Sequence, residues 1–141
     1  MIKEENLKGS RILIVDDQEA NVLLLERLLQ MAGYTNFIST TDPRQVLPLF
    51  SKFQPDLILL DLMMPEMNGF QFVEELRKNE DWREIPVVVI TAKNLTQEEH
   101  RLLDSQVGIV LQKGAYHSEE LLRETGRLVA NRIRKQTPNL V

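Results

Sequence analysis

Residues 57–69 of the chain, LILLDLMMPEMNG, decide its fold. The four apolar residues at its start fit a strand buried on both faces, which is typical of the centre of a parallel sheet. The strand runs directly into the carboxylate of Asp61, and Pro65 and Gly69 then interrupt the chain. A buried strand that ends on a charged residue indicates that this residue has a functional role at the end of the sheet.

Apolar runs of strand length alternate with helical patterns along the rest of the chain. Each predicted helix has a start or stop signal: Gly33, Asp42 with Pro43, Asn68, Thr96 with Glu99, and Ser118. This alternation predicts an α/β fold with a doubly wound five-stranded parallel sheet, a three-layer (βα)5 sandwich. The predicted strands are 11–15, 37–40, 56–61, 85–91 and 107–112.

The length and pattern predict one domain. A chain of 141 residues supports one hydrophobic core. We expect a domain at 10–135, a flexible N-terminal segment at 1–9 and a loose C-terminal tail at 136–141.

The composition argues against several classes of function. The net charge of −4, from 21 acidic and 17 basic residues, disfavours direct binding of nucleic acid. There is no cysteine, so a disulfide framework or a thiolate site is excluded. The start of the chain is polar and no apolar run is long enough to span a membrane, so we expect a cytoplasmic protein that does not bind membranes.

Polar residues follow four of the predicted strands. Asp16 and Asp17 come after the first, Asp61 ends the third, Thr91 ends the fourth and Lys113 follows the fifth. Because the carboxyl ends of parallel strands form the ligand crevice of such sheets, these side chains are predicted to meet there.

Three neighbouring carboxylates favour a hard cation with oxygen ligands, and the cluster therefore predicts Mg²⁺. Such a cation offsets the charge of an incoming phosphoryl group, while Lys113 and Thr91 cover the remaining oxygens. Asp61 could then be the nucleophile, because carboxylates form aspartyl phosphates.

These residues resemble a known family. VDD at 15–17, DLMMPEMNG at 61–69, the threonine of VVVITA at 87–92 and the lysine of LQKG at 111–114 look like the receiver domain of two-component response regulators. The resemblance covers roughly residues 10–134. It implies a flavodoxin-like fold with strand order 2-1-3-4-5 and a stand-alone regulator that takes part in two-component or phosphorelay signalling.

The resemblance also implies roles for individual residues. Asp61 would accept a phosphoryl group from a phosphohistidine of a sensor kinase or phosphotransfer protein. Asp17, Asp61 and the backbone carbonyl of Met63 would ligate Mg²⁺, with Asp16 acting through a water. Thr91 and Lys113 would hold the phosphoryl oxygens, and Thr91 would move when the phosphoryl group arrives. Such a chain is a signalling domain rather than an enzyme, acts on a downstream protein that the sequence does not name, and is a monomer or weak dimer.

The chain departs from the family pattern at two positions. Val110 stands where the family commonly has an aromatic residue that turns inward on phosphorylation. Gly114 stands where the family commonly has a proline in a cis bond, and we therefore predict a trans bond and a shifted loop after Lys113. The run VLQKGAYHSEELL at 110–122 is similar to receivers joined to hybrid histidine kinases.

Three other functions remain open. A phosphatase of the haloacid dehalogenase type also forms an aspartyl phosphate, but it needs a second aspartate where this chain has Met63. A flavodoxin-like flavin binder would need a phosphate-cradling loop where this chain has the acidic stretch 16–19. A binding module that works without phosphorylation is the third.

Other conspicuous residues have simpler interpretations. Met63, Met64 and Met67 are expected to fill gaps around the crevice. His100 and His117 are expected at the surface, and Trp82 as a partly exposed packing residue between a helix and a strand.

Overall fold

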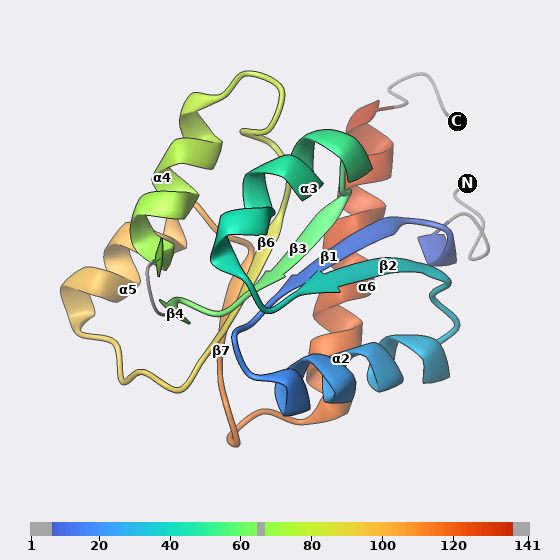
Figure 1. The fold of residues 1–141 in the computed structure, drawn as a ribbon, viewed down its shortest axis with the longest axis horizontal. Helices are drawn as coiled ribbons and strands as arrows, with labels where there is room; N and C mark the ends of the chain where they lie inside the picture. Colours follow the sequence, from blue (N-terminus) through green and yellow to red (C-terminus); the bar gives the residue numbers. More distant parts are fainter. Residues whose placement is uncertain (1–6, 65–66, 137–141) are drawn as a thin grey trace.

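A computed structural model describes residues 7–64 and 67–136 of the chain (Figure 1). Five parallel strands form one sheet in the order β2-β1-β3-β6-β7. The order confirms the predicted 2-1-3-4-5 arrangement, and each strand lies within a residue or two of its prediction. The strands are β1 (Arg11–Val15), β2 (Asn36–Thr40), β3 (Leu57–Leu60), β6 (Val87–Thr91) and β7 (Ile109–Gln112).

Helices cover both faces of the sheet, which confirms the three-layer sandwich. One face packs against α2 (Glu19–Met31) and α6 (Ser118–Gln136). The other packs against α3 (Val46–Phe53), which follows a short 3-10 turn at Pro43–Gln45, and against α4 (Gly69–Lys78) and α5 (Gln97–Asp104). In Figure 1, α3 crosses in front of the sheet and α6 runs behind it.

Each strand divides its residues between two cores, because successive side chains point to opposite faces. In β1, Leu13 and Val15 face α3 and α4, whereas Ile12 and Ile14 face α2 and α6. All four residues of β3 are buried, as a central strand of a parallel sheet requires.

The helices begin where short polar side chains cap them. Asn68 accepts hydrogen bonds from the first backbone N–H groups of α4, and Asp42 caps the 3-10 turn before α3. Thr96 and Glu99 form the predicted capping box at α5. These helix starts could be predicted from the sequence because a cap involves only neighbouring residues.

The segment after Asp61 differs from the prediction. Two-residue strands, β4 (Met63–Met64) and β5 (Met67–Asn68), pair antiparallel between β3 and α4. Gly69 does not break the chain: it is the buried first residue of α4, and an added Cβ there would lie 2.6 Å from Leu62 Cα. Glycine is therefore required by the close approach of the backbone at Leu62.

The predicted positions of the methionine, tryptophan and histidine side chains are confirmed in part. Met63 is 54% exposed, so its prediction as a gap filler was wrong, while Met64 is buried as expected; the side chain of Met67 lies outside the described residues. Trp82 is half-buried, and its ring lies 4.5 Å from that of Phe50. Two exposed side chains, His100 and His117, lie at the surface as predicted.

The described chain starts inside the expected N-terminal segment. Lys8 Nζ lies 4.3 Å from the centre of the Tyr34 ring, and the carbonyl of Gly9 accepts a hydrogen bond from Asn36 Nδ2. Residues 1–6 and 137–141 lie outside the described part, so the domain limits 10–135 stay a prediction.

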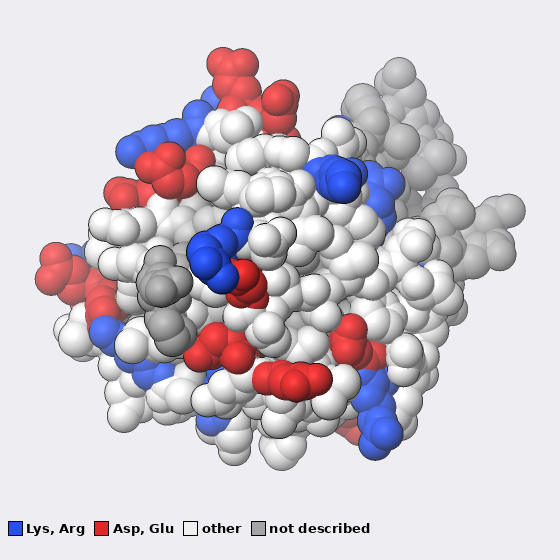
Figure 2. Space-filling view, in the orientation of Figure 1, with Lys and Arg blue, Asp and Glu red and all other residues white. Residues whose placement is uncertain are grey.

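The helices give no sign of a membrane-spanning segment among the described residues, and the face in Figure 2 does not carry charges of a single sign. Within the described ranges, none of the helices combines the length and apolar character needed to cross a membrane. Acidic and basic side chains are interspersed over the face that Figure 2 shows.

We predict that Gly69→Ala lowers the free energy of unfolding by about 1–3 kcal/mol, because the new methyl group collides with backbone atoms of Leu62. Gly126→Ala is the matched control. Gly126 lies inside α6, where a Cβ meets only the Tyr34 hydroxyl at 3.8 Å, so alanine should stabilise the chain by about 0.4–1 kcal/mol. Urea unfolding measures both; equal effects of the two changes would contradict the close-approach explanation.

Candidate functional site

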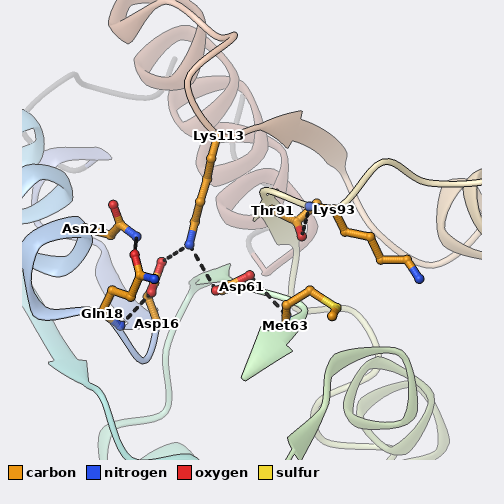
Figure 3. Close-up of polar contacts among 8 residues, drawn as sticks. All are labelled: Asp16, Gln18, Asn21, Asp61, Met63, Thr91, Lys93 and Lys113. Atoms are coloured by element: carbon orange, nitrogen blue, oxygen red, sulfur yellow. Dashed lines mark hydrogen bonds and ion pairs between the residues drawn. The ribbon is translucent and has the colours of Figure 1, made fainter. Parts of the chain in front are cut away.

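The predicted site residues lie together at the carboxyl ends of the strands (Figure 3). Asp16 follows β1, Asp61 follows β3, Thr91 ends β6 and Lys113 follows β7. The side chains of Asp16 and Asp61 and the hydroxyl-bearing Thr91 are all buried. Burial of polar groups at one edge of the sheet means that each must find a partner there.

The same local turn ends three of these strands. Asp16 Oδ1 accepts a hydrogen bond from Gln18 N at 2.9 Å, and Asp61 Oδ1 accepts one from Met63 N at 3.1 Å. Thr91 Oγ1 accepts one from Lys93 N at 3.2 Å. Each side chain thus bonds the backbone two residues ahead, a turn that Asp and Thr favour, and the turn fixes the side chain while it ends the strand.

Lys113 joins the two buried carboxylates. Its Nζ lies 2.9 Å from Asp16 Oδ2 and 3.0 Å from Asp61 Oδ2, and Figure 3 shows it between them. Because Oδ1 of each aspartate serves its own turn, each carboxylate has divided its oxygens between the backbone and the ammonium. The single ammonium offsets part of the two negative charges of these buried carboxylates.

A tight turn presents Lys113 to the crevice. The Ala115 N–H donates to the carbonyl of Gln112 at 3.1 Å, and Gly114 between them has φ +78°. These features define a turn whose third residue favours glycine. The backbone N–H of Lys113 donates to the carbonyl of Thr91 at 2.8 Å, and the peptide bond after Lys113 is trans, as predicted.

The electrostatics of the site follow from burial and from these contacts. Burial raises the pKa of the Asp61 carboxyl, and the hydrogen bonds from Met63 N–H and Lys113 counteract only part of that rise. Burial alone would lower the pKa of the Lys113 ammonium, but the hydrogen bonds to Asp16 and Asp61 outweigh it and raise the pKa. Lys113 therefore carries its charge throughout the neutral range.

The oxygen atoms that could hold a metal ion are close together. One carboxylate oxygen from each of Asp16, Asp17 and Asp61 lies within 4.8 Å of the others, and Asp17 is the most exposed of the three. Hard oxygen donors on an open rim fit a divalent cation such as Mg²⁺, which keeps several of its waters. The donor set thus fits the expected ion.

Thr91 and Lys93 lie beside this cluster (Figure 3). Lys93 contacts two helices: its Nζ lies 2.8 Å from Glu99 Oε2 of α5 and 5.9 Å from the centre of the Phe70 ring of α4. Val110 is half-buried, and together with Thr91 and His100 it lines a hollow of about 320 Å³ between β6, β7 and α5.

Two contributors escaped the sequence analysis. The backbone N–H of Gln18 donates to Asp16 and orients its carboxylate. In the sequence, only the position of Gln18 two residues after an aspartate could have indicated this hydrogen bond. Tyr116 is half-buried near Lys113 and Asp16, and burial raises the pKa of its phenol. Nothing in the sequence marked Tyr116, because the turn at Gly114 determines where it lies.

Comparison with known proteins assigns the class. The profile of the response regulator receiver domain matches residues 12–139, and the chain therefore belongs to this family. It is a receiver domain of two-component signalling, which confirms the resemblance and sets aside the phosphatase and the flavin binder.

Individual relatives agree with this assignment. The response regulator PleD of Caulobacter vibrioides is 47% identical over 84 residues, which are 60% of this chain and 18% of PleD. The polar-differentiation response regulator DivK of Brucella ovis is 35% identical over 91 residues, 64% of this chain and 73% of DivK. The chain thus spans less than a fifth of the length of PleD.

A solved structure shows the same fold with a metal ion. The receiver domain of the sensor histidine kinase PA1611 from Pseudomonas aeruginosa has a TM-score of 0.74 and 27% identity, over 86% of this chain and 98% of that one. That protein holds a magnesium ion coordinated in its active site cleft.

We predict that Lys113→Met in a metal-chelating buffer lowers the free energy of unfolding by on the order of 2–4 kcal/mol, because Asp16 and Asp61 stay buried without a cation. Lys78→Met is the control: Lys78 is largely exposed, so its change should stay within about 0.5 kcal/mol. Urea unfolding measures both. The variant Asp61→Asn with Lys113→Met should recover part of the loss, and equal effects of the two lysine changes would refute the role of the ion pairs.

Proposed function

We propose that Asp61 is the phosphoryl acceptor of this receiver domain. The observation that supports this role is the contact between Asp61 Oδ2 and Lys113 Nζ, beside two further carboxylates whose oxygens lie within 4.8 Å. A strand end holds the nucleophile in place, and the crevice places positive charge next to it.

In the proposed reaction, an oxygen of Asp61 attacks the phosphorus of a phosphohistidine. The new oxygen–phosphorus bond forms as the nitrogen–phosphorus bond breaks. The imidazole leaves with the electron pair as the neutral base, because its other ring nitrogen already carries a proton. Lys113 holds an oxygen of the transferred group, and the Thr91 hydroxyl holds another after it releases the N–H of Lys93. The Met63 N–H orients the carboxylate of Asp61.

The metal site of this proposal consists of Asp17, Asp61 and the backbone carbonyl of Met63, with Asp16 acting through a water. When bound, Mg²⁺ would offset the charge that builds up on the phosphoryl oxygens. The Met63 N–H donates to Asp61 Oδ1 at 3.1 Å, and this nearness of the Met63 backbone to Asp61 supports the proposed role of its carbonyl.

The proposed donors are sensor histidine kinases or histidine phosphotransfer proteins of the cytoplasm. The output passes to a downstream protein through a changed surface, and the domain assists only its own phosphorylation and slow dephosphorylation. The hollow beside Val110 is lined by Thr91, so a movement of Thr91 reaches the surface of α5 without an aromatic side chain.

We expect the full chain to gain the mass of one phosphoryl group when it is incubated with acetyl phosphate and Mg²⁺. Asp61→Asn should abolish the gain, because an amide is not a nucleophile for this transfer, and chelation of the metal should do the same. Asp104→Asn, at the exposed end of α5, is the control and should react like the parent chain. Intact-mass spectrometry checks all four samples; labelling of the Asp61→Asn chain would identify another acceptor.

Removal of one proposed ligand should weaken Mg²⁺ binding. Asp17→Asn takes a charge from the metal cluster, so the dissociation constant measured by titration calorimetry should rise by about tenfold or more. Glu19→Gln removes an exposed charge from the nearby first turn of α2 and should change the affinity far less. Equal effects would show that the cluster attracts the ion only through its general field.

A further inference from the structure

A second hollow lies at the opposite end of the sheet from Asp61. It has a volume of about 460 Å³, within the range of about 300–1,000 Å³ found for sites that bind small molecules. Three of its lining residues stand at or just before strands that end at the phosphoryl site: Arg11 begins β1, Asp56 precedes β3 and Ile85 precedes β6. The start of β1 and the last turns of α6 lie at the same end in Figure 1.

One wall of this hollow is apolar. Trp82, Pro55 and Ile85 line it, and the Trp82 ring is held by its tilted contact with Phe50 at 4.5 Å. Trp82 is half-buried and lines the hollow, so it can contact a ligand there. Such a wall suits a flat or branched hydrocarbon group.

Two of the four charged lining residues compensate each other. The backbone N–H of Arg11 donates to Asp56 Oδ2 at 2.8 Å, and Arg11 Nη2 lies 3.9 Å from Asp56 Oδ1. Arg11 Nε donates to the carbonyl of Gln54 at 2.8 Å. This pair therefore offers a ligand little net charge.

Arg132 is different. Its Nε is buried and has no hydrogen-bond acceptor among residues 7–64 and 67–136, and no carboxylate of these ranges forms an ion pair with it. A buried guanidinium N–H without an acceptor is unfavourable, and a turn of the side chain toward an acceptor in the hollow would satisfy it. The planar guanidinium favours a carboxylate, which it binds with two parallel hydrogen bonds.

We propose that this hollow is a binding site for a small monocarboxylate with an apolar body. The carboxylate binds to Arg132, and the apolar body lies against Trp82 and Pro55. Asp81, which also lines the hollow, adds a negative charge that disfavours a doubly charged phosphate. The site is separate from the acidic crevice, because the two lie at opposite ends of the same strands.

Phenylacetate is the probe for this proposal. Trp82 is the one tryptophan of the 141 residues, so its fluorescence reports on this hollow alone. Phenylacetate should change the emission of the full chain saturably. Phenethylamine, which has the same ring but a positive charge, and inorganic phosphate should not. Saturable binding of the amine with equal affinity would overturn the role of Arg132.

Arg132→Lys tests the guanidinium, because lysine keeps the charge and the stem but removes the planar fork. The dissociation constant for phenylacetate should rise about tenfold or more. Arg134→Lys is the control, since Arg134 is exposed on the same helix and bonds Asn131; it should bind like the parent chain. Near-ultraviolet circular dichroism checks that both variants are folded.

An independent measurement needs no variant. In amide-resolved NMR of the parent chain, phenylacetate should shift signals of Ser51, Gln54 and Asp56 together with the Trp82 indole. Absence of any saturable shift, or shifts confined to residues at the acidic crevice, would refute the proposal even if Arg132→Lys failed to fold.

Discussion

The two contacts from the Lys113 ammonium to Asp16 and Asp61 are the constraint on which the rest of the structure depends. Neighbouring strands of a sheet lie about 4.8 Å apart, and Lys113 follows the edge strand β7, so its long side chain must reach past β6 to β3 and β1. The observed strand order brings the ends of β1 and β3 within its reach. The order of the sheet thus contributes directly to the electrostatics of the crevice.

The strand ends also show how local and long-range structure agree. An aspartate or threonine that accepts a hydrogen bond from the backbone two residues ahead ends a strand. The same hydrogen bond fixes the orientation of the side chain toward the crevice, and in an aspartate it leaves the second oxygen available there. A short polar residue is thus at once a stop signal and a functional group. This double use explains why a fully buried strand such as β3 ends on a charge.

Sequence reasoning succeeded where the signal was local. Continuous apolar runs identified the strands, and Asn68 and Thr96 identified helix starts, because each pattern depends on adjacent residues. It also predicted that Asp16, Asp61 and Lys113 would meet, since parallel strands share their carboxyl end. The chemical roles of these residues remain predictions.

Sequence reasoning failed where distant backbone segments determine the outcome. The hairpin of β4 and β5 has two residues in each strand, too few for a period to appear. Gly69 was interpreted as an interruption, because its close contact with Leu62 is invisible without the fold. Met63 is exposed because that hairpin holds its backbone at the rim of the crevice.

The turn after Lys113 restricts how this chain could evolve. Gly114 has φ +78°, whereas the ring of proline holds φ near about −65°, so proline is incompatible with this backbone at this position. A proline at this one position would force the turn to change and would displace Lys113 from Asp16 and Asp61. Such an exchange therefore requires neighbouring residues of the turn to change with it.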